Sequence, residues 1–505
     1  MKVLCAVVSL AMLGAGYGRV QAQEVQRFPA SGAKGVNPDT HLVLTFTSAP
    51  VIGKSGQIRI YDMAGHKLVD TLDMSIPAGP DPAHRVGTPD IDPKPPTPTT
   101  TTPAVKSVPA DLHSYQLNTV GGLADFHFYP VIVHGNVATI YPHNGVLRYH
   151  RRYVVEMDPG VLTPAGGSFA GFKKSEWTFA TKSAGPKADA TRVVVAADGT
   201  GDFNTVQGAV DFVPANPVKR VTIFIRNGTY EEIVFFQKKS NITFEGEDRE
   251  KVQVGYANNS AFNPPMPGPS RRCAFSVYDS NGIVLENFSV SNYVYGQAEG
   301  LLVYGDKVVV KNVNIKGSGD ALNLRGRIYL EGSRIIGDGD TILGVGAAFF
   351  KDCEIQSMGP YMWIRNTEAN HGNVFVNCTF LTRQRPAAQR SADAAMKSAP
   401  ARPSMGAVLA RLPNNHGLNY PYAEAVLIHC KLSGIPPMGW GPVEADPAHL
   451  HLWEYGSTDL GGKPIDVSKR HPASRQLTME KDAETIANYS KPSFVLGGWD
   501  PTEGN

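Results

Sequence analysis

A unit of twenty residues that occurs twice in succession constrains the fold of this chain more than any other feature. The two copies read KNVNIKGSGDALNL, from Lys311, and EGSRIIGDGDTILG, from Glu331. Each copy has an alternating segment that ends in Ile, a glycine-rich turn, the dipeptide Gly-Asp and a short apolar segment. A unit this short buries its apolar face only by stacking on its neighbours, so the repeat predicts a solenoid.

Five-residue steps of the same kind recur outside these two copies. They end at Phe244, Val290, Ile315, Ile335, Ile355, Phe380 and Leu432, with separations of 46, 25, 20, 20, 25 and 52 residues. One coil therefore has 20–25 residues, and the larger separations hold two coils or an insertion. Because side chains alternate along a strand, the third and fifth residues of each step should point inward. The pattern predicts a parallel β-helix.

Two aspartates lie one repeat apart, since 340 − 320 = 20 for Asp320 and Asp340. In stacked coils they occupy the same place on adjacent coils, where neighbouring strands are about 4.8 Å apart. That spacing is close to the separation of acid and nucleophile pairs in hydrolases. Two carboxyl groups so close cannot both ionise freely, so one should stay protonated. The pair is the candidate active site, and two ordinary turn aspartates are the alternative.

Three of the five cysteines stand at third positions of the steps, namely Cys353, Cys378 and Cys430. We interpret them as small buried residues of the inner stack. A disulfide framework or a metal site is the alternative, but no histidine cluster and no CxxC spacing accompanies them. We therefore expect no metal at these cysteines.

The first 22 residues resemble a secretory signal peptide, with Lys2, an apolar run from Val3 to Gly14 and a small residue at Ala22. The run is short for a membrane span, and we expect none in the mature chain. These features predict a secreted or periplasmic protein. The formal net charge of +2 gives no basis for binding nucleic acid. We also expect the protein to be a monomer.

Four further segments complete the predicted organisation. Residues 23–183 alternate apolar and polar residues between Gly, Asn, Asp and Pro turns, and they resemble bacterial immunoglobulin-like β-sandwich domains. Residues 77–110 form a Pro/Thr-rich loop within that domain, and residues 184–191 form a linker. The repeat domain follows at 192–505, with an Ala/Pro/Arg-rich insertion at 383–404. A helix from Thr205 to Val213 should cap the open end of its solenoid.

From about Val193 to Pro501, the chain resembles the pectin methylesterases (pectinesterases). DGTGDFNTVQGAVDFVP and RVTIFIRNGTYEE are similar to the opening segment of that family. GQAEGLLV places Gln297 at the glutamine of the family's HQAVAL-like motif. GSGDALNL places Asp320 at the aspartate of GYQDTLY, and GDGDTILG places Asp340 at the aspartate of VDFIFG. AVLARLP is similar to the LGRPW segment and places Arg411 at its arginine.

The resemblance implies a right-handed parallel β-helix that hydrolyses methyl esters of polygalacturonate without a cofactor. It also implies one role for each matched residue. Asp340 would be the nucleophile, and Asp320 the general acid and then the general base. Gln297 would donate a hydrogen bond to the oxyanion, and Arg411 would hold Asp340 ionised and oriented.

The sequence departs from the family at several places around these motifs. Gly319 replaces a second glutamine, and Ser318, Asn323, Thr341 and Leu343 stand where the family motifs have aromatic residues. Substrate contacts should then come from other residues, for which Tyr295, Tyr361, Trp363 and Arg325 are the candidates. An esterase for a different acylated substrate, or a polysaccharide-binding β-helix with weak or no turnover, remains the alternative.

Overall fold

The structure is a computed structural model that describes residues 25–80, 114–384, 406–414, 419–444 and 446–503. The expected signal peptide lies outside these residues. So do most of the Pro/Thr-rich loop at 77–110 and most of the insertion at 383–404.

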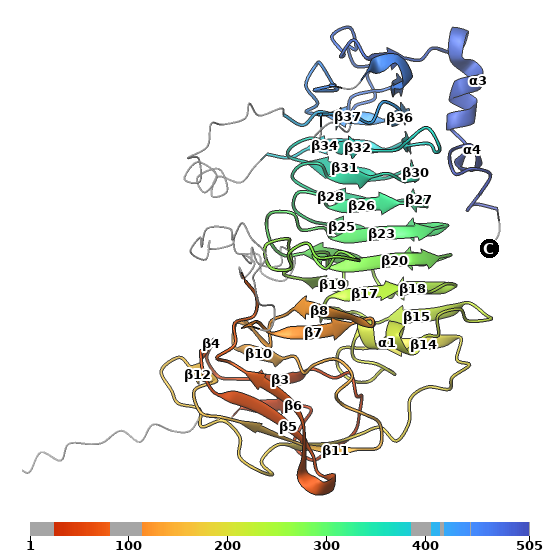
Figure 1. Cartoon of the computed structure of the whole chain (residues 1–505). Helices are drawn as coiled ribbons and strands as arrows, with labels where there is room; N and C mark the ends of the chain where they lie inside the picture. Colours follow the sequence, from red (N-terminus) through yellow and green to blue (C-terminus); the bar gives the residue numbers. More distant parts are fainter. Residues whose placement is uncertain (1–24, 81–113, 385–405, 415–418, 445, 504–505) are drawn as a thin grey trace, which may run out of the picture.

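Stacked coils form the larger part of the molecule, and each coil adds one strand to each of three parallel sheets (Figure 1). In the described residues, the first sheet contains β14 (Arg192–Val195), β15 (Val221–Ile225), β18 (Ile242–Gly246), β21 (Val284–Glu286), β24 (Val308–Lys311), β27 (Arg327–Glu331), β30 (Ala347–Lys351), β33 (Asn373–Val376), β36 (Glu424–Ile428), β38 (His451–Tyr455) and β39 (Ser474–Gln476). The second contains β16 (Gly228–Glu231), β19 (Val252–Tyr256), β22 (Ser289–Asn292), β25 (Asn314–Lys316), β28 (Arg334–Ile336), β31 (Glu354–Ser357), β34 (Thr379–Thr382) and β37 (Lys431–Ser433). The third contains β17 (Val234–Gln237), β20 (Phe275–Asn281), β23 (Leu301–Asp306), β26 (Leu322–Arg325), β29 (Ile342–Gly344), β32 (Met362–Ile364) and β35 (Ala410–Arg411). The predicted parallel β-helix is confirmed.

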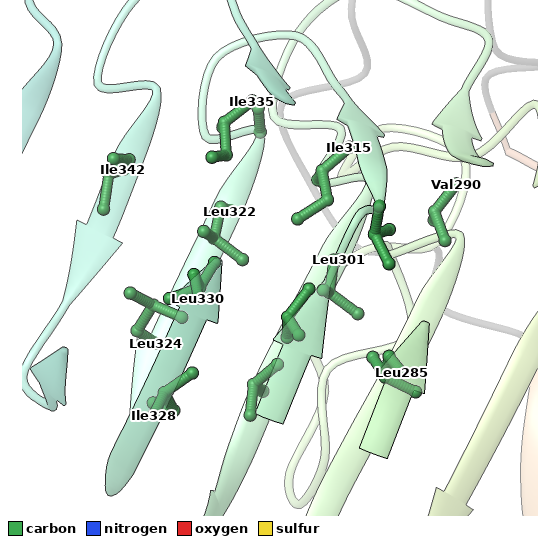
Figure 2. Close-up of a cluster of buried hydrophobic side chains, with 14 of the residues drawn as sticks. Leu285, Val290, Leu301, Ile315, Leu322, Leu324, Ile328, Leu330, Ile335 and Ile342 are labelled. Atoms are coloured by element: carbon green, nitrogen blue, oxygen red, sulfur yellow. The ribbon is translucent and has the colours of Figure 1, made fainter. Parts of the chain in front are cut away.

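The core consists of apolar side chains stacked in register from coil to coil. In the second sheet, this ladder contains Val290, Ile315, Ile335, Ile355, Phe380 and Leu432, all of them buried. Figure 2 shows Val290, Ile315 and Ile335 pointing into the same interior as Leu322 and Ile342 of the third sheet. Six of the seven predicted steps therefore end in one continuous row. Each coil buries its inner face against the next, which makes the array cooperative.

The first predicted step, which ends at Phe244, belongs to a different row. Phe244 lies on β18 of the first sheet and pairs with Leu285. The true counterpart of Val290 is Val254 on β19. The steps look alike because each has a left-handed residue at its second position: Asn241, Asn287, Asn312, Gly332, Asp352, Asn377 and His429. Asn adopts this conformation readily, and the same turn occurs at another corner of the coil.

The three cysteines lie in the interior, as predicted. Cys353, Cys378 and Cys430 are buried and free, and the sulfur of Cys378 lies 3.4 Å from the backbone nitrogen of Cys353. These three coils thus each place one small side chain at the same corner. Burial also raises the pKa of the Cys378 thiol, as expected for a packed sulfur rather than a reactive one.

Helices lie at one end and along one side of the coils. Helix α1 (Val206–Phe212) begins at Thr205, whose hydroxyl accepts a hydrogen bond from the backbone nitrogen of Gly208. It packs on β14, β15 and β17 of the first coil, which confirms the predicted capping helix. Helices α3 (Met479–Tyr489) and α4 (Pro492–Val495) lie beside later coils (Figure 1). Among the described residues, no helix combines the length and apolar character needed to cross a bilayer.

The N-terminal residues form a β module that packs against the first coils (Figure 1). One sheet contains β1 (Gln26–Phe28), β3 (Leu42–Thr45), β10 (Val137–Ile140) and β9 (Val131–His134). The other contains β2 (Ala33–Val36), β13 (Thr178–Thr181), β11 (Arg152–Met157), β5 (Gln57–Asp62) and β6 (Lys67–Asp73). Two strand pairs complete it, namely β4 (Pro50–Ile52) with β12 (Leu162–Pro164), and β7 (Leu117–Val120) with β8 (Leu123–His127). The immunoglobulin-like assignment and the boundaries at 183 and 191 stay predictions.

One hydrophobic cluster runs from this module into the β-helix. The Phe126 and Phe235 rings lie 5.8 Å apart, and the Tyr129 and Phe262 rings stack at 4.6 Å. The cluster also includes Tyr293, which follows β22. The module therefore covers apolar surface on the β-helix instead of being joined to it only through the linker.

Candidate active site

The two candidate aspartates lie just before adjacent strands of the third sheet. Leu322 on β26 pairs with Ile342 on β29, and Asp320 and Asp340 each stand two residues earlier. They therefore occupy equivalent positions on neighbouring coils, as the twenty-residue spacing predicted. Their side chains are 10% and 17% exposed, so both carboxyl groups are largely shielded yet still reach the surface.

Arg411 holds the Asp340 carboxylate from the far side of β32. The Nε atom of Arg411 donates to Oδ1 of Asp340 at 2.6 Å, and a terminal guanidinium nitrogen donates to Oδ2. This two-point contact fixes the orientation of the carboxylate. Asp340 also has a φ angle of 45°, an uncommon conformation for a residue with a side chain.

The surroundings of Asp320 raise the pKa of its carboxyl group. Burial, with smaller contributions from the charges of Glu299 and Asp340, raises the pKa of Asp320 to about 7. The positive charges of Arg272 and Arg365 act in the opposite direction. One carboxyl group of the site thus stays protonated in mildly acidic solution, while its neighbour is paired with a guanidinium.

Gln297 lies on the coil before Asp320, and its side chain is exposed. Its Oε1 atom accepts a hydrogen bond from Arg272 at 3.0 Å. The oxygen end of the amide is therefore committed to Arg272, and the nitrogen end is the one available to donate to a substrate. This is the polarity that an oxyanion donor requires.

Gly319, which stands where the family has a second glutamine, contributes a backbone hydrogen bond to the turn and no side-chain amide. The backbone nitrogen of Gly319 donates to Oδ1 of Asp338, and the Ser318 hydroxyl donates to Oδ2 of Asp338 at 2.8 Å. Asp338 thus ties the turn before Asp340 to the turn before Asp320. It keeps the two turns in register from one coil to the next.

The four predicted substrate contacts are in different surroundings. Trp363 lies beside the site, with the guanidinium carbons of Arg365 and Arg411 at 3.7 and 4.5 Å from its ring centres. Arg325 is exposed at the end of β26, over the Tyr304 ring. Tyr295 is half-buried, two residues before Gln297. All three stay predictions, and Trp363 is the one in contact with the arginine that holds Asp340.

Tyr361 is wrong as a substrate contact. Its side chain is fully buried in the core, at 5.3 Å from the Phe380 ring, and its hydroxyl lies 3.1 Å from the Thr382 hydroxyl. The residue stands where the chain turns from the second sheet into the third, so its side chain points into the corner between them.

The charged residues at the site that the sequence did not predict include a buried ion pair, Arg272 and Glu299. The Glu299 side chain is fully buried and paired with Arg272. A signal was present, because Glu299 interrupts the apolar part of GQAEGLLV and lies 21 residues before Asp320, about one coil. Arg272 carried no comparable signal, since it belongs to the segment before β20, outside the repeated steps.

Comparisons with known proteins agree on one family. The family model described as pectinesterase matches residues 192–498. Pectinesterase QRT1 of Arabidopsis thaliana is 32% identical over 353 residues, which cover 65% of this chain and 84% of that protein. Pectinesterase/pectinesterase inhibitor 18 of the same plant is 27% identical over 315 residues, 61% of this chain and 53% of its own length. The chain thus spans about half the length of that relative.

Solved structures with a similar backbone include pectin methylesterase from carrot. It has a TM-score of 0.49 and 24% identity, covering 63% of this chain and 95% of the carrot chain. Pectin methylesterase PemA from Erwinia chrysanthemi has a TM-score of 0.44 and 20% identity, covering 61% of this chain and 98% of that chain.

Proposed function

Because the chain belongs to the pectinesterase family, we propose that it is a carboxylic ester hydrolase that removes methyl groups from methylated polygalacturonate. The observation that carries the proposal is the pair of unlike carboxyl groups on adjacent coils. Asp340 is held by Arg411, and the pKa of Asp320 is raised to about 7. One group is thus suited to attack and the other to deliver a proton.

In the first half of the proposed reaction, an Asp340 oxygen attacks the carbonyl carbon of the methyl ester. The carbonyl oxygen becomes an oxyanion, to which the Gln297 amide donates a hydrogen bond. The bond to the methoxy oxygen then breaks, and that oxygen takes the proton of Asp320 to leave as methanol. The galacturonyl group is left joined to Asp340 as an anhydride.

In the second half, Asp320 is a carboxylate and acts as a base. It takes a proton from water, and the resulting hydroxide attacks the galacturonyl carbonyl carbon. The bond to Asp340 breaks, which restores the Asp340 carboxylate and releases a galacturonic acid group, whose proton passes to the solvent. The proton is again on Asp320, so the cycle needs no cofactor.

A nearby stacking surface supports a sugar substrate. Trp363 lies in line with Arg411 across the pairing of β32 with β35. We propose Trp363 and Tyr295 as sugar contacts and Arg325 as a contact for a galacturonate carboxylate. We also propose that the protein acts outside the cytoplasm, which is what the signal-like segment at its start supports.

The test is methanol release from highly methylated pectin, with the polymer length measured in parallel. We expect methanol without shortening. Asp340→Asn keeps a side chain of the same size beside Arg411 and should lower the rate by at least about 1,000-fold, because the nucleophile is lost. Asp306→Asn is the matched control, since Asp306 lies at the end of β23 in the third sheet and is also paired with an arginine, Arg327 of β27.

Other outcomes separate the alternatives. Shortened chains would point to a glycoside hydrolase or lyase. Release of a different acyl group, with methyl esters left intact, would favour another esterase, a reading that the replacement of the family glutamine by Gly319 supports. Binding to pectin without any turnover would leave only a polysaccharide-binding role.

A further inference from the structure

A third carboxylate continues the row formed by the two aspartates. Leu301 on β23 pairs with Leu322, so Glu299 stands at the position equivalent to Asp320 on the preceding coil. Unlike the aspartates, the Glu299 side chain has no solvent exposure. A buried carboxylate is unfavourable unless it is paired and hydrogen-bonded, so Glu299 needs a partner that compensates its charge.

That partner is Arg272, which reaches three side chains at once. Its Nε atom lies 2.9 and 2.8 Å from the two Glu299 oxygens, and one terminal nitrogen also donates to Glu299. The other terminal nitrogen donates to Gln297 at 3.0 Å, and the first lies 3.3 Å from Oδ2 of Asp320. A planar guanidinium with five donors can make these contacts together, whereas an ammonium group cannot.

We propose that Arg272, anchored by the buried Glu299, is a positioning residue that fixes the Asp320 carboxyl and the Gln297 amide in their working orientations. The inference rests on the proposed function, because those two groups act on the ester. Arg272 binds the oxygen of Gln297, so the amide nitrogen is turned toward the substrate. Glu299 balances the arginine charge, so Asp320 is held in place without being forced to ionise.

The electrostatic part of the inference can be measured without substrate. Asp320 faces the negative charges of Glu299 and Asp340 and the positive charges of Arg272 and Arg365. The difference in melting temperature between a protein and its Asp320→Asn derivative, followed against pH, reports the titration of Asp320 in the folded state. This readout serves for every variant below.

Three variants separate charge from geometry. Glu299→Gln removes a negative neighbour, so the Asp320 midpoint should move to lower pH by about one unit or more. Arg272→Gln removes a positive neighbour and should move it higher. The double variant Arg272→Gln/Glu299→Gln leaves no unpaired buried charge, so it should fold and should show a midpoint close to that of the unmodified protein.

Kinetics on methylated pectin test the positioning part. The double variant should lose at least about tenfold in kcat with little change in KM, because the amide donor and the acid are no longer oriented. Gln297→Ala should cost much less in the double variant than in the unmodified protein, since Arg272 acts through Gln297. The kcat of Arg272→Lys should stay below that of the unmodified protein, because lysine keeps the positive charge but cannot make the three contacts.

The control is Arg334→Lys, which changes a surface arginine paired with Glu354 in the second sheet. It should leave both readouts unchanged. The inference is overturned if the Asp320 midpoint stays in place in Glu299→Gln and Arg272→Gln, or if Arg272→Lys restores full kcat. If the unmodified protein releases no methanol, the proposed function fails, while the midpoint shifts still test whether Arg272 and Glu299 act on Asp320.

Discussion

At the scale of single residues, the site is built from carboxyl groups that chemistry makes unequal. Asp340 and Asp320 stand at equivalent places on neighbouring coils, yet Arg411 is paired with the first, and burial dominates the second. Equivalent positions in a repeat do not imply equivalent surroundings. The difference comes from the burial of Asp320 and from the pairing of Asp340 with Arg411.

Methanol release should fall as pH rises through about 7. The first half of the reaction needs Asp320 protonated, and the raised pKa of Asp320 keeps it so only below that value. Above it, the rate of the first step should fall by about tenfold for each pH unit. The measurement is kcat on methylated pectin from pH 5 to pH 9, with the melting temperature followed in parallel. A constant or rising kcat above pH 7 would contradict the assignment of Asp320 as the acid.

The sequence predicts the residues of this site that belong to the twenty-residue repeat. Asp320 and Asp340 were placed correctly on adjacent coils because a spacing of one repeat fixes a spatial neighbour. Arg272 escaped because its segment precedes β20 and has no periodic partner. Tyr361 was misjudged because the direction of a residue at a corner depends on how the chain turns, which strand alternation does not predict.

At the scale of elements, the corner between the first and second sheets depends on left-handed residues. Asn377, with φ of 55°, precedes β34, and its side chain is exposed. The same conformation recurs at the equivalent place on successive coils. This is why the turns could be recognised from sequence, and also why the step ending at Phe244, which has its own left-handed Asn241, was assigned to the wrong row.

Asn377 offers a test of this corner. Asn377→Gly should leave the free energy of unfolding nearly unchanged, because glycine adopts the left-handed region freely. Asn377→Val should lower it by about 1–2 kcal/mol, since a β-branched residue is strained there. Chemical denaturation of both variants gives the comparison. Equal stability of the two would mean that the corner does not require this conformation.

At the scale of the whole molecule, carboxyl groups gather where the N-terminal module meets the first coil. Oδ2 of Asp39, in the module, accepts hydrogen bonds from the backbone nitrogens of Asn204 and Thr205, each at 2.8 Å. Glu232, after β16, accepts from the backbone nitrogens of Val206 and Gln207. Both carboxyl groups thus satisfy donors at the start of α1, and burial raises the pKa of each, that of Glu232 to about 8.

Stability should therefore decrease as pH rises from about 4.5 to about 8. In that window the unfolded chain loses the Glu232 proton, whereas the folded protein keeps it until the pH approaches 8. The stabilising contribution is complete below 4.5 and is lost as pH rises through 8. Comparison of melting temperatures at pH 5 and pH 8.5 tests this, and Glu232→Gln should reduce the difference. An unchanged difference in that variant would assign the effect to other groups.

The shared cluster of Phe126, Phe235, Tyr129 and Phe262 has a practical consequence for anyone who wishes to shorten the protein. A fragment starting at the predicted linker would expose the apolar surface at the end of the first coil. Two such fragments could bury these surfaces against each other, so we expect them to self-associate in solution. We expect such a fragment to aggregate during purification. The N-terminal module would then be required to keep the β-helix monomeric in solution.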